Sequence, residues 1–174
     1  MNEQIQLDNL DAIIFDFDGV LTDNRVYLNE NGEESVACNR SDGIGFNVLN
    51  KIKKPTYIVS SETNRVVTQR AKKVNIPVIH GVNNKLSAIE DLSASENISL
   101  ERTLYVGNDL NDFHAMKRCG FSVCPADSHP KIKEISNWIL QSNGGDGVVR
   151  EIVELLLKID IVDTIYNFKK EEKL

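Results

Sequence analysis

Short apolar runs recur along the chain and are separated by longer segments in which apolar residues follow a helical period. The runs lie at Ala12–Phe15, Thr56–Val59, Val78–Ile79, Leu104–Val106 and Phe121–Val123, with one more at Trp138–Leu140. Runs of this kind are typical of parallel strands that are buried on both faces. They predict the strands of one sheet, with the last run as a short edge strand.

The segments between these runs carry helix signals. They predict helices from Ser41-Asp42 onward, at Glu62–Lys73, Asn84–Leu92 and Leu110–Arg118, and after Asp146, with Ser41-Asp42 and Asp146 as amino-terminal caps. Strands that alternate with helices predict an α/β fold, a Rossmann-like three-layer sandwich with a mostly parallel sheet. The tail from Asn167 is rich in Lys and Glu and predicts a frayed helix end.

One insertion interrupts the alternation directly after the first strand. Val26–Leu28 and Ser35–Cys38 flank Asn29-Glu30-Asn31-Gly32, and Asn-Gly between β-prone runs predicts a hairpin. A two-stranded hairpin is marginal in water because it has little core of its own. We expect a small flap, over about residues 25–39, that folds back on the domain or packs on another subunit.

Length and charge narrow the function classes. The 174 residues fit one domain, and a net charge of −6 argues against a basic surface for nucleic acid. No apolar run is long enough to span a bilayer, and the polar first residues are unlike a signal peptide. Three cysteines without metal-type spacing (Cys38, Cys119 and Cys124) make a disulfide framework unexpected. We expect a cytoplasmic protein without nucleic-acid or membrane partners.

Two carboxylates and a glycine follow the first strand. Asp16 and Asp18 stand two apart on extended backbone, so their side chains point the same way. Paired carboxylates repel each other when buried, which makes a cation their natural partner. Gly19 allows the backbone to turn sharply and to approach a ligand closely. Because ligands bind at the carboxyl ends of strands in open α/β sheets, we expect the site here.

Later strands also end in polar residues. Ser60, after the second strand, either contacts a ligand or caps the next helix. Lys85 lies at a predicted helix start, where the helix dipole disfavours a cation, so a nearby anion explains it better than a solvated surface does. The fourth strand runs into Gly107-Asn108-Asp109-Leu110-Asn111-Asp112.

The sequence Asp-Phe-Asp-Gly-Val-Leu-Thr-Asp at residues 16–23 resembles the first motif of the haloacid dehalogenase superfamily of phosphohydrolases. The later clusters are similar to the other three motifs, in the same order. The resemblance implies that Asp16 attacks phosphorus and forms an aspartyl-phosphate, and that Asp18 acts as acid and base beside Mg²⁺. It also implies that Ser60 hydrogen-bonds a phosphoryl oxygen and that Lys85 holds the phosphate and the nucleophilic carboxylate.

The fourth motif departs from the family. Its usual form begins Gly-Asp-Asp, and the first Asp is a metal ligand, whereas this chain has Asn108 there. An amide oxygen can bind a cation but carries no charge, so lower metal affinity is expected. The implied metal residues are therefore Asp16 and Asp18 with Asn108 or Asp109, and Asp112 orients the shell.

The chain looks most like the capless branch that dephosphorylates 3-deoxy-octulosonate 8-phosphate, from about Leu10 to Leu157. That branch typically reads Thr-Gly-Arg after the second strand. Ser61-Glu62-Thr63-Asn64 instead resembles a sister group that acts on nine-carbon, sialic-acid-type 9-phosphates, and the phosphatase-like domains of sialic acid cytidylyltransferases. Glu62, Arg70 and Lys73 of this chain match substrate-binding positions of that group. Arg70 and Lys73 equally fit a solvated basic face of a helix.

Two functions remain open. The first is a Mg²⁺-dependent phosphatase of a ulosonic acid phosphate, with a nine-carbon 9-phosphate preferred over 3-deoxy-octulosonate 8-phosphate. The second is a weakly active or inactive domain that supports a cytidylyltransferase, which Asn108 favours. In either case we expect a homotetramer, since the chain has no room for a large cap and capless relatives assemble through this hairpin. The residues that favour the enzyme are Asp16, Asp18, Ser60 and Lys85.

Overall fold

A parallel sheet forms the centre of the molecule, for which a computed structural model describes residues 5–167. Within that range the sheet has six strands in the order β5-β4-β1-β6-β7-β8, and each pair of neighbours is parallel. The strands are β1 (Ala12–Phe15), β4 (Thr56–Val59), β5 (Val78–Ile79), β6 (Thr103–Val106), β7 (Phe121–Cys124) and β8 (Trp138–Ile139). The parallel sheet expected from the apolar runs, with a short edge strand, is confirmed.

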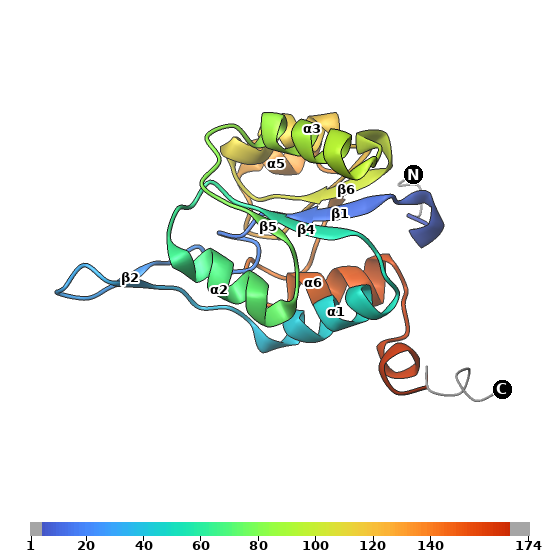
Figure 1. Ribbon diagram of the computed structural model, residues 1–174, viewed down its shortest axis with the longest axis horizontal. Helices are drawn as coiled ribbons and strands as arrows, with labels where there is room; N and C mark the ends of the chain where they lie inside the picture. Colours follow the sequence, from blue (N-terminus) through green and yellow to red (C-terminus); the bar gives the residue numbers. More distant parts are fainter. Residues whose placement is uncertain (1–4, 168–174) are drawn as a thin grey trace.

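Helices cover both faces of this sheet (Figure 1). The helices α1 (Arg40–Lys51), α2 (Arg65–Val74) and α6 (Val148–Glu151) lie on one face, and α3 (Lys85–Glu96) and α5 (Pro130–Ile135) on the other, where α4 (Phe113–Arg118) packs against both. The alternation of side chains along β1 divides the core accordingly. Ile13 and Phe15 belong to the cluster beneath α1 and α6, and Ile14 belongs to the cluster beneath α3 and α4. The three-layer α/β prediction is confirmed, with no large cap in the described residues.

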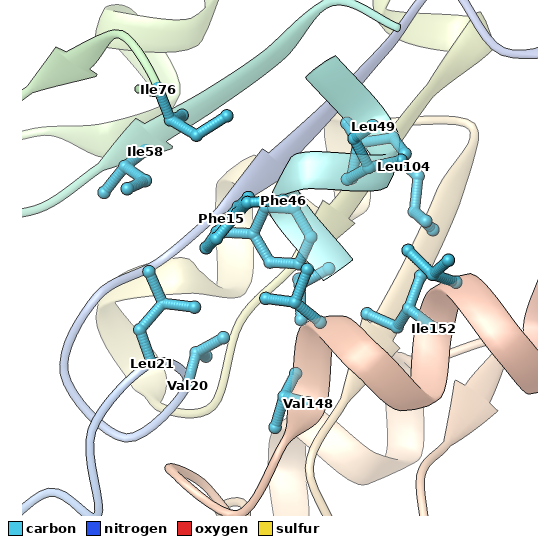
Figure 2. Packing of buried hydrophobic residues seen from close by; sticks show 14 of the residues in the cluster. Phe15, Val20, Leu21, Phe46, Leu49, Ile58, Ile76, Leu104, Val148 and Ile152 are labelled. Carbon is cyan, nitrogen blue, oxygen red and sulfur yellow. The ribbon is translucent and has the colours of Figure 1, made fainter. Parts of the chain in front are cut away.

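Aromatic packing fixes the end of β1. The Phe15 ring meets the Phe46 ring of α1 edge to face, with 5.3 Å between centroids (Figure 2). Leu49 and Ile152 complete this part of the core, and all four side chains are inaccessible to solvent. Burial of each such side chain contributes about 1.5–3 kcal/mol. The residue after Phe15 therefore emerges from a rigid support.

Helix caps differ from the sequence prediction. The helix α1 begins at Arg40 because the Asn39 side chain accepts the N–H of Ser41. Asp42, predicted to cap α1, instead accepts the N–H of Val149 in α6 at 2.9 Å. Asp146 was the expected cap of that last helix, but Gly147 occupies the N-cap position and no side chain there caps α6.

Other boundaries also differ. The helix α2 begins at Arg65, with Asn64 as its cap, so Glu62 lies in the preceding loop. The predicted helix at Leu110–Arg118 is a 3-10 turn, Leu110–Asp112, followed by α4, and the short helix α5 was not predicted. After α6 the chain continues in π-helical turns at Ile152–Leu156 and Asp163–Asn167. A C-terminal helical tail is also expected over about residues 158–174, and its described part contains the π-helical turn at Asp163–Asn167. The frayed end expected after Asn167 lies outside the described residues.

The predicted hairpin forms and extends away from the helices and sheet (Figure 1). Its strands β2 (Tyr27–Leu28) and β3 (Glu34–Ser35) pair antiparallel, and an isolated bridge between Thr22 and Cys38 closes its base. The hairpin contacts the domain at Glu34, whose Oε2 accepts a hydrogen bond from Asn64 Nδ2 at 3.0 Å. No helix in residues 5–167 is both long enough and apolar enough to cross a membrane.

Candidate active site

The carboxyl ends of β1, β4 and β6 open into one pocket of about 470 Å³. Most of the residues singled out in the sequence lie in its wall, although they come from three separate parts of the chain. The lining residues are Asp16, Asp18, Asn24, Ser60, Ser61, Glu62, Asn108, Asp109, Leu110 and Asn111.

The loop after β1 is shaped by its own hydrogen bonds. Asp16 is almost fully buried, and its Oδ1 accepts the N–H of Phe17 at 2.7 Å. Gly19 has φ +75°, and its N–H donates to Thr22 Oγ1 at 3.1 Å. A Cβ atom on Gly19 would lie 1.9 Å from Asn108 Nδ2. Only glycine therefore allows the β1 and β6 loops to approach this closely.

A buried ion-pair network underlies the pocket. Lys85 Nζ lies 2.6 Å from Asp16 Oδ1 and 2.7 Å from Asp112 Oδ1, and all three side chains are at most 4% exposed. Charges buried this deeply persist only when they are paired. The lysine at the start of α3 thus binds two carboxylates from two different loops, and it holds Asp16 in place.

The pKa values of two carboxyl groups in the pocket, those of Asp16 and Asp18, are raised. Desolvation, followed by repulsion from Asp112, raises the pKa of Asp16 well above its usual value, although Lys85 opposes this. Desolvation, followed by repulsion from Glu62, raises the pKa of Asp18. Desolvation lowers the pKa of Lys85, but Asp16 and Asp112 together outweigh it and raise that pKa. A cation near Asp16 would stabilise its charged form.

The amide of Asn108 supplies an oxygen for such a cation. Its Oδ1 is buried and has no hydrogen-bond partner within residues 5–167. A buried acceptor without a donor costs about 1–3 kcal/mol, and a hard cation would satisfy it. The carboxylate of Asp109 is exposed and accepts the N–H of Leu110 at 2.7 Å, so it is occupied in capping the turn.

The side-chain oxygens of Asp16, Asp18 and Asn108 fit Mg²⁺, but they carry one negative charge fewer than three carboxylates would. The described residues contain no group of three or more His, Cys, Asp or Glu side chains that could hold a metal ion. Asp16, Asp18 and Asn108 are nevertheless oxygen donors, which Mg²⁺ prefers. In such a site the uncharged amide of Asn108 would stand where the family motif has an aspartate.

Ser60 and Glu62 shape the β4 side of the pocket. Ser60 is 1% exposed, and its Oγ accepts the N–H of Glu62 at 3.1 Å, which leaves its O–H able to donate to a ligand. Glu62 Oε1 accepts the N–H groups of Thr63 and Asn64, each at 2.7 Å. Its carboxylate is thereby fixed in the pocket wall.

Arg70 and Lys73 lie outside the pocket that contains Asp16. They line a second pocket of about 500 Å³, which is bounded by α1 and α2 and also contains Arg40. The guanidinium of Arg70 donates to the carbonyl oxygen of Asn39 at 2.6 Å. Within one chain, the structure does not bring these two basic residues together with Asp16.

Sequence reasoning missed Tyr105 and Thr22. Tyr105 lies in the middle of β6, and its hydroxyl donates to Asp112 Oδ1 at 2.9 Å. A tyrosine inside a fully buried strand is a usable signal, because its hydroxyl needs a partner. Thr22 Oγ1 accepts the N–H groups of Gly19 and Asn24.

Comparison with known proteins agrees with this geometry. Residues 46–152 match the haloacid dehalogenase-like hydrolase family. The 3-deoxy-D-manno-octulosonate 8-phosphate phosphatase of Escherichia coli K12 is 36% identical over 151 residues, which cover 86% of this chain and 80% of that protein. A haloacid dehalogenase family hydrolase from Streptomyces avermitilis superposes with a TM-score of 0.87 at 37% identity and covers 90% of each chain.

A further solved structure carries ligands. The 3-deoxy-D-manno-octulosonate 8-phosphate phosphatase of Moraxella catarrhalis, in complex with magnesium, phosphate and its eight-carbon sugar acid, has a TM-score of 0.82 at 29% identity. It covers 94% of this chain, and this chain covers 91% of it.

The chain belongs to the haloacid dehalogenase-like hydrolases. The relatives place it in the branch that contains the 3-deoxy-D-manno-octulosonate 8-phosphate phosphatases, as the sequence motifs indicate, and it is a phosphatase.

Proposed function

We propose that the protein is a Mg²⁺-dependent phosphatase of a ulosonic acid phosphate and that its substrate is a nine-carbon, sialic-acid-type 9-phosphate. The observation that carries the choice of substrate is Glu62. Its carboxylate is held in the wall of the pocket that contains Asp16 and Asp18, in a loop that differs from the Thr-Gly-Arg of eight-carbon enzymes. A fixed acceptor at that point can bind hydroxyl groups of a longer sugar.

Each residue of the pocket has a separate role in the proposed reaction. Asp16 Oδ1 is held by Lys85 and Phe17, so we assign the attack on phosphorus to Oδ2. As the new O–P bond forms and the ester P–O bond breaks, Asp18 gives its proton to the leaving oxygen. Asp18 then takes a proton from water, which attacks phosphorus, releases inorganic phosphate and regenerates Asp16. The hydroxyl of Ser60 donates to a phosphoryl oxygen.

Positive charge from Mg²⁺ and Lys85 is the remaining part of the proposed mechanism. Bound Mg²⁺ would be held by Asp16, Asp18 and Asn108, and it would offset the negative charge of the phosphate. Lys85 adds a permanent positive charge beside the nucleophile. Both effects allow an anionic carboxylate to approach an anionic ester.

Arg70 and Lys73 require a second subunit in this proposal. Their pocket also contains Arg40 and is separate from the catalytic pocket of the same chain. Three cationic side chains suit the carboxylate of a ulosonic acid. We infer that this basic pocket faces the catalytic pocket of a neighbouring subunit in a homotetramer.

The test is a screen of Mg²⁺-dependent phosphate release from eight- and nine-carbon ulosonic acid phosphates and from p-nitrophenyl phosphate. We expect kcat/KM for a nine-carbon 9-phosphate to exceed that for 3-deoxy-octulosonate 8-phosphate by about tenfold or more. Asp16→Asn, which removes the nucleophile, is the inactive control. Preference for the eight-carbon ester would overturn the choice of substrate and leave the phosphatase assignment intact.

The same screen tests the basic pocket. Arg70→Ala with Lys73→Ala should lower kcat/KM for the nine-carbon ester by about tenfold and change p-nitrophenyl phosphate hydrolysis by less than about twofold. Lys72→Ala is the matched control, because Lys72 is an exposed lysine of α2 outside that pocket. An equal fall in kcat/KM for both esters would mean that Arg70 and Lys73 do not contact the sugar acid.

A second candidate function has one observation in its favour. The neutral Asn108 weakens the charge of the metal site, as expected for a weakly active domain that supports a sialic acid cytidylyltransferase. Negligible turnover of every ester at saturating Mg²⁺, in a folded protein, would favour this function over the enzyme.

A further inference from the structure

We propose that Tyr105 is a positioning residue of the phosphatase reaction. Its hydroxyl orients the Asp112 carboxylate and, through that carboxylate, both the Lys85 ammonium group and the loop that carries Asn108.

The surroundings of Tyr105 make its hydroxyl costly without a partner. The side chain is fully buried in β6, in the cluster that also contains Ile14, Ile89 and Met116. Phenylalanine would fill the same volume and leave no polar group to satisfy. The hydroxyl is explained by Asp112, whose Oδ1 it reaches at 2.9 Å.

Asp112 joins the two sides of the catalytic machinery. Its Oδ1 accepts from Tyr105 and, at 2.7 Å, from Lys85. Its Oδ2 accepts the N–H of Asn108 at 2.9 Å and that of Asp109 at 3.3 Å. Donors on both oxygens fix the plane of the carboxylate, so a rotation would displace Lys85 and the Asn108 loop together.

Charge explains why a neutral donor is needed. Lys85 shares one positive charge between Asp112 and Asp16, from whose Oδ1 it lies 2.6 Å away. The Tyr105 hydroxyl stabilises Asp112 without adding charge. When that hydrogen bond is removed, Asp112 draws Lys85 closer, and the reacting carboxylate loses part of its electrostatic support. Tyr105 itself does not line the substrate pocket.

The test is Tyr105→Phe, assayed with p-nitrophenyl phosphate at saturating Mg²⁺. We expect kcat to fall about tenfold, because one hydrogen bond to a buried charge is lost, while KM changes by less than about twofold. The melting temperature should fall by no more than about 4 °C. Tyr57→Phe is the matched control, since Tyr57 lies in β4, which β1 separates from β6, and its hydroxyl meets Glu96 at 3.4 Å, away from the pocket. The kcat of this variant should be unchanged.

Each other outcome overturns the proposal. A kcat within about twofold of the wild type would show that Asp112 needs no help from Tyr105. A loss of kcat together with a much larger fall in melting temperature would assign the hydroxyl a role in stability alone. A rise in KM at constant kcat would point to substrate binding. Because p-nitrophenyl phosphate carries no sugar, none of these results depends on the proposed nine-carbon substrate.

Discussion

Asn108 differs from the aspartate of the family motif by one charge, and its position makes that difference measurable. Its Oδ1 is buried and unpartnered within the described residues, and its Nδ2 lies against Gly19. Its backbone N–H is already bonded to Asp112. A change of the side chain therefore alters the charge of the metal site and leaves the loop anchored.

We expect Asn108→Asp to tighten Mg²⁺ binding by about tenfold and to raise turnover, because a third carboxylate oxygen attracts the cation more strongly than an amide does. The measurement is a calorimetric Mg²⁺ titration alongside phosphate release. Asn111→Asp, a similar change at another residue of the same pocket, is the control for added charge alone. Identical titrations for the wild type and Asn108→Asp would mean that Asp109 or water already completes the shell.

The sequence was informative about the site wherever polar residues stand close to the carboxyl end of a buried strand. Asp16, Ser60 and Asn108 could be placed together because parallel strands end at the same edge of the sheet. Tyr105 lies inside a strand and gives a different signal: its buried hydroxyl needs a partner, but the sequence does not identify that partner. Nor could the pocket that contains Arg70 be located, because the direction in which a helix face points depends on how α2 packs.

Among the elements, α6 is attached to α1 by a buried carboxylate. Asp42 accepts the N–H of Val149 at 2.9 Å, and its other oxygen has no partner within residues 5–167. Desolvation raises the pKa of Asp42 to about 6, and the hydrogen bonds from Val149 and Arg150 oppose the rise. The folded protein therefore binds this proton more tightly than the unfolded chain does.

The sign of the pH dependence follows from this difference. The contribution of Asp42 to the free energy of unfolding is fully present below about pH 4, which is the pKa of an aspartate in the unfolded chain. It is lost as the pH rises through about 6, the pKa of Asp42 in the folded protein. Asp42→Asn keeps an acceptor for Val149 but does not titrate. We expect the free energy of unfolding of the variant, relative to the wild type, to rise by up to about 3 kcal/mol between pH 4 and pH 7.

Urea unfolding at several pH values measures this difference. Asp91→Asn is the control, because it removes an exposed carboxylate from α3, on the opposite face of the sheet from α1 and α6 (Figure 1). A difference between Asp42→Asn and the wild type that does not change with pH would contradict the raised pKa.

The same pair of elements shows where local sequence rules fail. Capping preferences select Asp146 for the last helix, whereas the side chain that accepts its N–H groups lies 107 positions earlier in the chain. Only the tertiary fold brings Asp42 to that helix end. The helix α5 has six residues, too few for a periodic pattern to reveal it. The strands were predicted more accurately, because their apolar runs are set by burial on both faces.

At the scale of the whole molecule, the hairpin indicates an assembly. Val26, Tyr27 and Leu28 are 57%, 54% and 66% exposed, on an element that extends away from the domain (Figure 1). A two-stranded hairpin is marginal alone, and exposed apolar residues on it gain free energy when another surface covers them. The basic pocket that contains Arg70 is also separate from the catalytic pocket of its own chain. We propose that a homotetramer resolves both features, since closed symmetry buries each hairpin and roofs each site.

Light scattering at micromolar concentration should give four times the chain mass of 19.5 kDa. Val26→Asp with Leu28→Asp should yield smaller species with lower kcat/KM for the ulosonic acid ester, because charges would be buried in the interface and water would reach the aspartyl-phosphate. Ile139→Asp is the matched control, since Ile139 is 53% exposed on the edge strand β8 and should remain tetrameric. A monomer with full activity would exclude any contribution of a neighbouring subunit to the site, and Arg70 and Lys73 would then have no route to the substrate.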